Sequence, residues 1–203
     1  MARFCLLAAA GVMLALSASQ SSPVSAQATA ASEKPRFGAD NELPRPENYR
    51  EWIYLSSGIG MSYNPATNSA GNPNPPFDNV FVTPAAYRSF LQTGTWPEGT
   101  MFVLELRGSA SEGSINRQGR FQQQLMGIEV EVKDSMRFPG KWAFYEFGRT
   151  NPTAKPLPTT AGCYSCHSQN GAVDNTFVQF YPTLADIARQ KGTFKESTSA
   201  PQQ

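Results

Sequence analysis

The sequence predicts an α+β fold that is built mainly of antiparallel β-sheet and carries three short helices. Several short runs are rich in β-branched and aromatic side chains, as strands are. Loops rich in Pro, Gly and Asn separate these runs, which leaves little room for long helices. One run, IEVEVK at residues 128–133, alternates apolar and charged side chains with a period of two, which is typical of a half-buried strand.

Five strands are expected along the chain. A short helix or turn over residues 46–50 leads into the first of them. The strands are expected at residues 51–58, 79–83, 100–106, 128–133 and 142–147. Because side chains alternate along a strand, the third should direct Phe102, Leu104 and Leu106 to one side of the sheet. Polar loops are expected over residues 63–78 and 108–119.

Three helices are expected as well. The first covers residues 84–91 and begins with a proline, which suits the first turn of a helix. The second begins at a pair of cysteines near the C-terminal end. The third covers residues 182–191 and is amphipathic, because Leu184, Ile187 and Ala188 fall on one face.

The N-terminus has the pattern of a secretory signal peptide over residues 1–26. Arg3 supplies the positive start, residues 4–16 are apolar, and Val24-Ser25-Ala26 is a small-x-small cleavage site. The apolar run is shorter than the roughly 20 residues that a spanning helix needs. We therefore expect a periplasmic or secreted protein that has no membrane anchor after processing.

The rest of the chain is expected to form one domain at residues 49–195. A flexible arm at 27–48 precedes it and a disordered tail at 196–203 follows, because both segments are rich in small and polar residues. Loss of Arg3 with the leader leaves equal numbers of basic and acidic residues. No run of basic charge indicates nucleic acid or a membrane surface as a partner.

The most informative motif ends at His167, the only histidine of the chain. His167 completes Cys163-Tyr164-Ser165-Cys166-His167, a C-x-x-C-H sequence, which is the attachment signature of c-type haem. In this chemistry the two thiols add to the haem vinyl groups and the imidazole ligates the iron. One motif and one histidine predict one covalent haem c per chain, with no second histidine ligand.

Three other origins of the cysteine pair remain open. A redox-active pair normally opens a helix after a buried strand, whereas the segment at residues 150–162 is polar and rich in proline. A zinc site needs about four ligands, so two cysteines and one histidine would have to be joined by carboxylates. The third origin is chance. Haem attachment is the interpretation that we favour.

Several segments, taken in order, resemble the cytochrome P-460 and cytochrome c′-beta family. They are NYREW (48–52), VFVTPAAY (80–87), TGTWPEGTMFVLEL (93–106), GIEVEVKDSMRFPGKWAFYEF (127–147), CYSCH (163–167) and FVQFYP (177–182). The resemblance implies a mainly β, homodimeric, periplasmic protein with one five-coordinate haem. It also implies one of two activities, because enzymatic members oxidise hydroxylamine, whereas c′-beta members bind nitric oxide.

The resemblance points to particular site residues. In the oxidising members a lysine is bonded to the haem rim, and the corresponding residue here is Leu104, which has no nitrogen to make that bond. We expect Leu104 to line the haem pocket. Phe102 or Leu106, on the same side of the strand, would then help cap the iron, unless Phe102 is ordinary core. Glu129 corresponds to a carboxylate that accepts a proton in the oxidising members. The alternation leaves another possibility, that Glu129 and Glu131 form a solvated strand face. The oxidising members also carry an arginine near the start of the preceding strand. That arginine is absent here, and Asp78 lies near the corresponding position.

Further residues are weaker candidates for contact with the haem. The candidates for a sixth, methionine ligand are Met61, Met101, Met126 and Met136. Methionine is more often a core residue, however. Arg107 and Arg88 are candidates for pairing with the haem propionates, since arginine pairs well with carboxylates.

Three functions therefore remain in competition. The first is an open-faced haem c cytochrome that binds small ligands such as nitric oxide and transfers electrons. The second is an oxidoreductase that oxidises hydroxylamine or a similar nitrogen compound, with Glu129 as proton acceptor and a soluble redox partner as electron acceptor. The third is a plain electron carrier with a methionine as sixth ligand.

Overall fold

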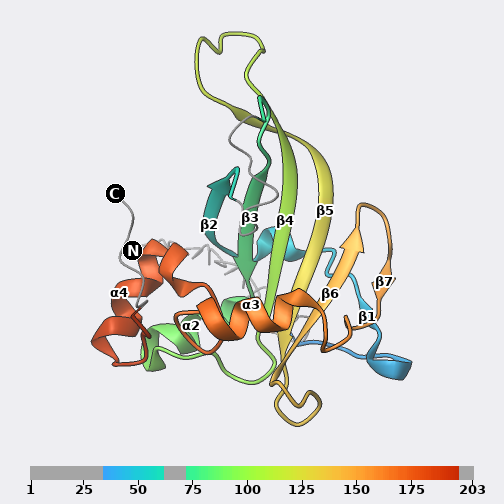
Figure 1. Cartoon of the computed structure of the whole chain (residues 1–203), viewed down its shortest axis with the longest axis vertical. Helices are drawn as coiled ribbons and strands as arrows, with labels where there is room; N and C mark the ends of the chain where they lie inside the picture. The colour runs from blue at the N-terminus through green and yellow to red at the C-terminus, as the bar shows by residue number, and fades with distance from the viewer. Residues whose placement is uncertain (1–33, 62–71, 197–203) are drawn as a thin grey trace, which may run out of the picture.

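A five-stranded antiparallel sheet forms the centre of the computed structural model, which describes residues 34–61 and 72–196 (Figure 1). Its strands lie in the sequential order β2-β3-β4-β5-β6. They are β2 (Ile53–Ile59), β3 (Phe77–Val82), β4 (Met101–Ala110), β5 (Phe121–Lys133) and β6 (Trp142–Gly148). All five expected strands are present, which confirms the predicted α+β, mainly antiparallel class.

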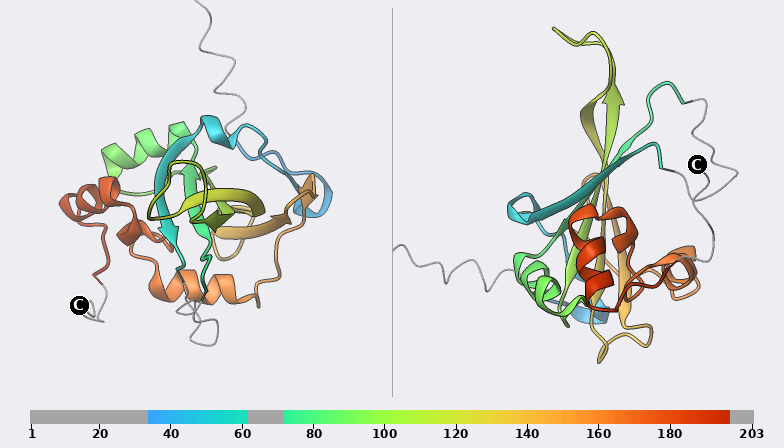
Figure 2. Two further views of the ribbon diagram at one scale, coloured as in Figure 1. Left: turned by 90° about the horizontal axis from the view of Figure 1, so that it is seen from above. Right: turned by 90° about the vertical axis from the view of Figure 1, so that its left-hand side faces the viewer.

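In the described part of the chain, three helices gather at one end of the sheet, and the hairpin of β4 and β5 projects from the other end (Figures 1 and 2). They are α2 (Pro84–Thr93), α3 (Gly162–Asn170) and α4 (Pro182–Gln190). As expected, Leu184 and Ala188 of α4 are buried and Ile187 packs against the same core cluster. Among the described residues, no helix is long and apolar enough to cross a membrane.

Helix α2 ends beside the C-terminal end of α4. Gly94 follows the helix in the left-handed conformation, with φ of 72°, a position that favours glycine. A side chain at Gly94 would meet Lys191 Cβ at 2.7 Å and Thr193 Oγ1 at 2.8 Å. The Thr193 hydroxyl donates a hydrogen bond of 2.7 Å to the Gly94 carbonyl. Glycine therefore lets the two helix ends meet.

The β4–β5 hairpin is longer than the sequence pattern predicts. Strand β4 continues to Ala110 and β5 begins at Phe121, so the loop expected over residues 108–119 is shorter. Residues 121–124 are exposed, and the register shifts around Arg107. The buried residues opposite them, Gly108 and Ser109, do not carry apolar side chains. This part of the hairpin therefore has no apolar alternation from which a strand would be predicted.

The second half of the segment expected to be a flexible arm, residues 27–48, packs on the domain. A 3₁₀ turn, η1 (Ala39–Asn41), leads into the two-residue strand β1 (Leu43–Pro44), which pairs with β7 (Thr153–Ala154). Leu43 is only 1% exposed. Its burial fixes a segment whose polar composition predicted disorder. The expected signal peptide, residues 27–33 of the arm and residues 197–203 of the tail lie outside the described residues.

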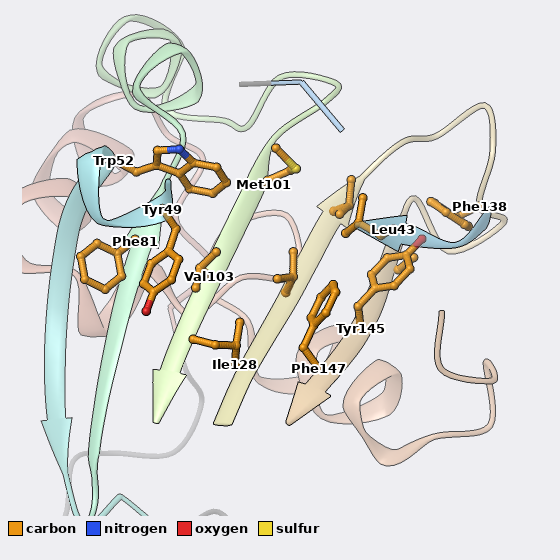
Figure 3. Close-up of a cluster of buried hydrophobic side chains, with 13 residues drawn as sticks. Leu43, Tyr49, Trp52, Phe81, Met101, Val103, Ile128, Phe138, Tyr145 and Phe147 are labelled. Atoms are coloured by element: carbon orange, nitrogen blue, oxygen red, sulfur yellow. The ribbon is translucent and has the colours of Figure 1, made fainter. Parts of the chain in front are cut away.

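The two faces of the sheet carry separate apolar clusters. One face holds Val103, Ile128 and Phe147, which Leu43, Tyr49 and Trp52 of the N-terminal segment join (Figure 3). The other face holds Phe102, Trp142 and Phe144, and helices α2 and α4 contribute to its cluster. Phe102 and Val103 therefore point in opposite directions, as the alternation along β4 requires.

Glu105 lies on the first of these faces and is completely buried. Its carboxylate accepts hydrogen bonds from Tyr49 and Arg50 of the 3₁₀ turn η2 (Tyr49–Glu51), from Asn79 at 3.1 Å and from Arg107 Nε at 2.7 Å. Burial alone would raise the pKa of Glu105, but these donors together lower it. The buried charge is thus matched, as buried charges must be, and it ties η2 to the middle of the sheet.

Candidate functional site

A cavity of about 380 Å³ opens between the sheet and helix α3. Most of its lining is apolar, which is usual for a site that takes an organic cofactor. Strands β3, β4, β5 and β6 contribute Val80, Phe102, Leu104, Leu106, Glu129, Glu131 and Phe144. The opposite wall contains Leu157, Cys163, Cys166, His167, Phe177 and Tyr181.

Helix α3 brings the three motif residues to the cavity. Cys163, Cys166 and His167 stand three and four positions apart, and such positions share one face of a helix. Both thiols are free. The next residue, Tyr164, holds the helix in place, since its hydroxyl donates to the Leu157 carbonyl at 3.0 Å and its ring packs edge-on against Phe144 at 4.8 Å.

The imidazole of His167 is fixed in orientation. Its Nδ1 lies 3.0 Å from the carbonyl oxygen of Asn175. A carbonyl oxygen only accepts hydrogen bonds, so Nδ1 carries the proton and Nε2 is left with the lone pair that a metal requires. The rings of Phe144 and Phe177 flank the imidazole at 4.6 Å and 4.4 Å between centroids.

Glu131 also reaches His167, which the sequence did not indicate. Glu131 Oε2 lies 3.2 Å from His167 Nδ1, and the Glu131 side chain is 11% exposed. Glu131 is thus not part of a solvated face, which was one of the two possibilities for the alternating strand. Burial lowers the pKa of the His167 imidazole, but Glu131 and the Asn175 carbonyl outweigh that effect and raise the pKa overall.

Leu104 and Glu129 form the cavity wall further along the sheet. They are directly opposite each other on β4 and β5, and both line the cavity together with Phe102 and Leu106. The shared side of Phe102, Leu104 and Leu106 is therefore as predicted. Burial raises the pKa of the Glu129 carboxyl, and the negative charges of Glu146 and Asp78 raise it further. Glu129 is exposed at the surface of the open cavity, so it does not belong to an outer solvated face.

Phe102 is a core residue that also forms part of the cavity wall. It is 2% exposed, and its ring packs against Trp96 at 4.7 Å and Tyr181 at 6.3 Å. The interpretation of Phe102 as a core residue is therefore confirmed, and its role in capping the iron stays a prediction.

A comparison with protein families identifies the chain. The model of the family described as Cytochrome P460 matches residues 46–178, which contain β2 to β6 and helix α3. The chain belongs to the cytochrome P460 family. It is accordingly a haem-binding cytochrome. A search of curated proteins gave no match.

The cavity of this cytochrome P460 family member fits a haem. Its apolar lining suits the faces of a macrocycle, and two free thiols and one oriented imidazole stand together on its α3 wall. Cys163 and Cys166 would hold the macrocycle and His167 the iron. Among the described residues, no three His, Cys, Asp or Glu side chains are placed so that they could hold one metal ion, which disfavours the zinc alternative. Burial raises the pKa of the Cys163 thiol, whereas redox-active cysteines usually have a lowered pKa.

The structure separates the weaker sequence candidates. Of the four methionines, Met61 lines the cavity, Met101 is buried on the other face of the sheet, and Met126 and Met136 are exposed. Asp78 also lines the cavity, and burial raises its pKa to about 6.

Among the described residues that line the cavity, neither arginine candidate is present. Arg107 pairs with Glu105, whose carboxylate belongs to the other face of the sheet, and Arg88 is exposed on α2. The pairing with haem propionates that the sequence suggested for them is therefore not supported. Charge complementarity alone could not show where each arginine lies relative to the cavity.

Proposed function

We propose that this chain is an exported mono-haem c cytochrome that binds small ligands such as nitric oxide at an open iron face. Cys163 and Cys166 form thioether bonds to the haem, and His167 ligates the iron through Nε2. One C-x-x-C-H motif and one histidine support one haem per chain. When bound, the haem supplies an iron that takes a diatomic ligand and exchanges one electron.

We prefer ligand binding to oxidation because residue 104 is a leucine. In the oxidising members that this sequence resembles, a lysine at this position is bonded to the haem rim. Here the side chain at the cavity wall is apolar, and no lysine of the described chain lines the cavity. The cavity wall at this position is apolar, because it consists of the side chains of Leu104, Leu106 and Phe102. These side chains limit the entry of water. An unmodified haem c in an apolar pocket suits a small neutral ligand.

The test uses the mature protein produced with a haem-maturation system. We expect the mass of one covalently bound haem, an ordinary ferrous haem c spectrum without a red-shifted Soret band, and a spectral change with nitric oxide. Replacing both Cys163 and Cys166 with serine should remove the covalent haem. A colourless wild-type protein with the mass of the bare polypeptide would contradict the proposal.

The second candidate function is oxidation of hydroxylamine or a similar nitrogen compound, and the position of Glu129 favours it. A carboxyl with a raised pKa at the cavity wall is suited to accept a proton from a bound substrate and later release it. The electrons would pass to a soluble redox partner. Turnover of hydroxylamine with an artificial electron acceptor distinguishes this enzyme from a ligand-binding protein.

The third candidate is an electron carrier with Met61 as sixth ligand, since Met61 is the candidate methionine that lines the cavity. A low-spin spectrum that becomes high-spin in Met61→Ala would support the carrier. An unchanged high-spin spectrum would support the open iron face.

Export and assembly complete the proposal. Residues 1–26 support secretion to the periplasm, which fits haem c attachment. We also propose a homodimer, because Tyr54 of β2 and Phe121 and Met126 of β5 expose large apolar side chains, with Tyr54 53% exposed. The mass of the holoprotein measured by light scattering tests the dimer. A monomer at high concentration would contradict it.

A further inference from the structure

We propose that Glu131 is a positioning residue for the axial histidine and makes His167 a stronger electron donor to the iron than a carbonyl contact alone would. This inference rests on the proposed haem c site. It concerns Nδ1 of His167, the ring nitrogen that would not bind the iron.

The geometry places two acceptors at one N–H group. His167 Nδ1 lies 3.0 Å from the Asn175 carbonyl oxygen and 3.2 Å from Glu131 Oε2. This Glu131 oxygen is buried and has no hydrogen-bond partner among the described residues, so its approach to Nδ1 is an ion-pair contact. Leaving a buried acceptor without a donor costs about 1–3 kcal/mol. The imidazole N–H is the donor within reach that can reduce this cost.

The surroundings of Glu131 strengthen its effect on the ring. On the sheet, Glu131 stands between Phe102 of β4 and Phe144 of β6. Phe144 also packs against the His167 ring. Aromatic side chains on both neighbouring strands keep the local dielectric constant low, so the carboxylate and the imidazole N–H interact more strongly than they would in water.

The nearest cation on the same strand face has other partners. Lys133 forms an ion pair with Asp174 and donates a hydrogen bond of 2.6 Å to the Trp96 carbonyl. Lys133 therefore does not neutralise Glu131 directly. Through Asp174 it instead holds the turn that presents the Asn175 carbonyl to His167. Thus Glu131 and Lys133, two positions apart on β5, support the histidine in two different ways.

Glu129 serves as the internal comparison. It lies on the same strand and the same face, and it faces Leu104 at the cavity wall. Because the pKa of Glu129 is raised, the comparison is made at a pH above its titration, where Glu129→Gln removes a second negative charge from the same strand face. A purely electrostatic influence on the iron would therefore move the reduction potential in both variants, whereas a contact with Nδ1 also alters the iron–histidine bond.

The chemical consequence follows from the carboxylate oxygen beside the Nδ1–H group. A carboxylate partner at Nδ1–H increases electron density at Nε2 and raises the basicity of the ligand. A more basic ligand strengthens the iron–histidine bond and favours the ferric state.

The experiment compares Glu131→Gln, Glu131→Asp and Glu129→Gln in the mature holoprotein. Glutamine keeps the shape of the glutamate and removes its charge, whereas aspartate keeps the charge and withdraws it from the ring. Resonance Raman spectroscopy of the ferrous protein measures the iron–histidine stretching frequency. We expect the highest frequency in the wild type and in Glu129→Gln, a lower one in Glu131→Asp and the lowest in Glu131→Gln. Electrochemistry should show a higher reduction potential in Glu131→Gln.

The outcomes separate this inference from the haem proposal. A wild-type protein without covalent haem would overturn both. A normal haem c spectrum with the same iron–histidine frequency in the wild type, Glu131→Asp and Glu131→Gln would overturn the role of Glu131 alone. A frequency that also fell in Glu129→Gln by an equal amount would show a general charge effect, and it would likewise overturn the assigned contact.

Discussion

Leu104 and Glu129 face each other across the β4–β5 pair, so the cavity wall joins an apolar side chain to a carboxyl with a raised pKa. The apolar partner excludes water and cannot bond to the haem. The acidic partner can exchange a proton with a bound molecule. This pair therefore decides between a ligand-binding cytochrome and an oxidising one, and two of the predictions below test its members separately.

Replacing Leu104 with alanine should open the cavity wall to water. We expect a ferric spectrum that shifts toward a water-bound form, together with a loss of about 1–2 kcal/mol of unfolding free energy, because Leu104 is only half-buried. Absorption spectra and denaturant unfolding measure the two effects. Leu91→Ala, at an exposed position of α2, is the control and should change neither. An unaltered spectrum in Leu104→Ala would place Leu104 away from the iron.

Replacing Glu129 with glutamine should abolish proton acceptance at the cavity wall. If the wild type oxidises hydroxylamine, we expect the rate with an artificial acceptor to fall by about 10²-fold or more, the usual contribution of a general base. Glu146→Gln removes the charge of the neighbouring residue on β6 and should retain most of the rate. Equal rates in all three proteins would exclude Glu129 as the base, and no turnover in the wild type would favour ligand binding.

The stability of the protein should depend on the titration of Asp78. Burial raises the pKa of Asp78 to about 6 in the folded protein, so folding favours its protonated form. Stability from this group is therefore complete below the unfolded-state pKa of about 4 and is lost as the pH rises through about 6. Urea midpoints should show that Asp78→Asn gains stability over the wild type near pH 8 and not near pH 4. Asp186→Asn, on the surface, should show no such gain, and a pH-independent difference for Asp78→Asn would contradict the assignment.

The contact between the ends of α2 and α4 should depend on the absence of a side chain at Gly94. We expect Gly94→Ala to lose about 2–3 kcal/mol of unfolding free energy, because the new Cβ adds a clash to the cost of a positive φ. Gly192→Ala is a matched control, since Gly192 also has a positive φ, of 69°, but no atom within 4 Å of the added Cβ. It should lose about 1 kcal/mol. Equal losses in thermal or denaturant unfolding would mean that only the backbone conformation matters.

The local patterns predicted the secondary structure wherever one side of an element is buried. Alternation along residues 128–133 and along β4 predicted which side chains share a face of the sheet. The structure confirms this arrangement. The same method failed for the outer half of the β4–β5 hairpin and for β1. In the outer hairpin the buried residues, Gly108 and Ser109, are not apolar, and in β1 a single buried leucine is too short a pattern to recognise.

By itself, the sequence determined the C-x-x-C-H motif, the common helix face of Cys163, Cys166 and His167, and the absence of a lysine at position 104. These features depend on residue identity and on spacing within one element, which the chain carries along its length. Only the tertiary structure shows that Glu131 contacts His167 and that Met61 and Asp78 line the cavity. It alone also shows that the donors to Glu105 come from η2 and β3. Such contacts join residues far apart in the chain, and they arise when the register of the sheet and the docking of α3 are fixed together.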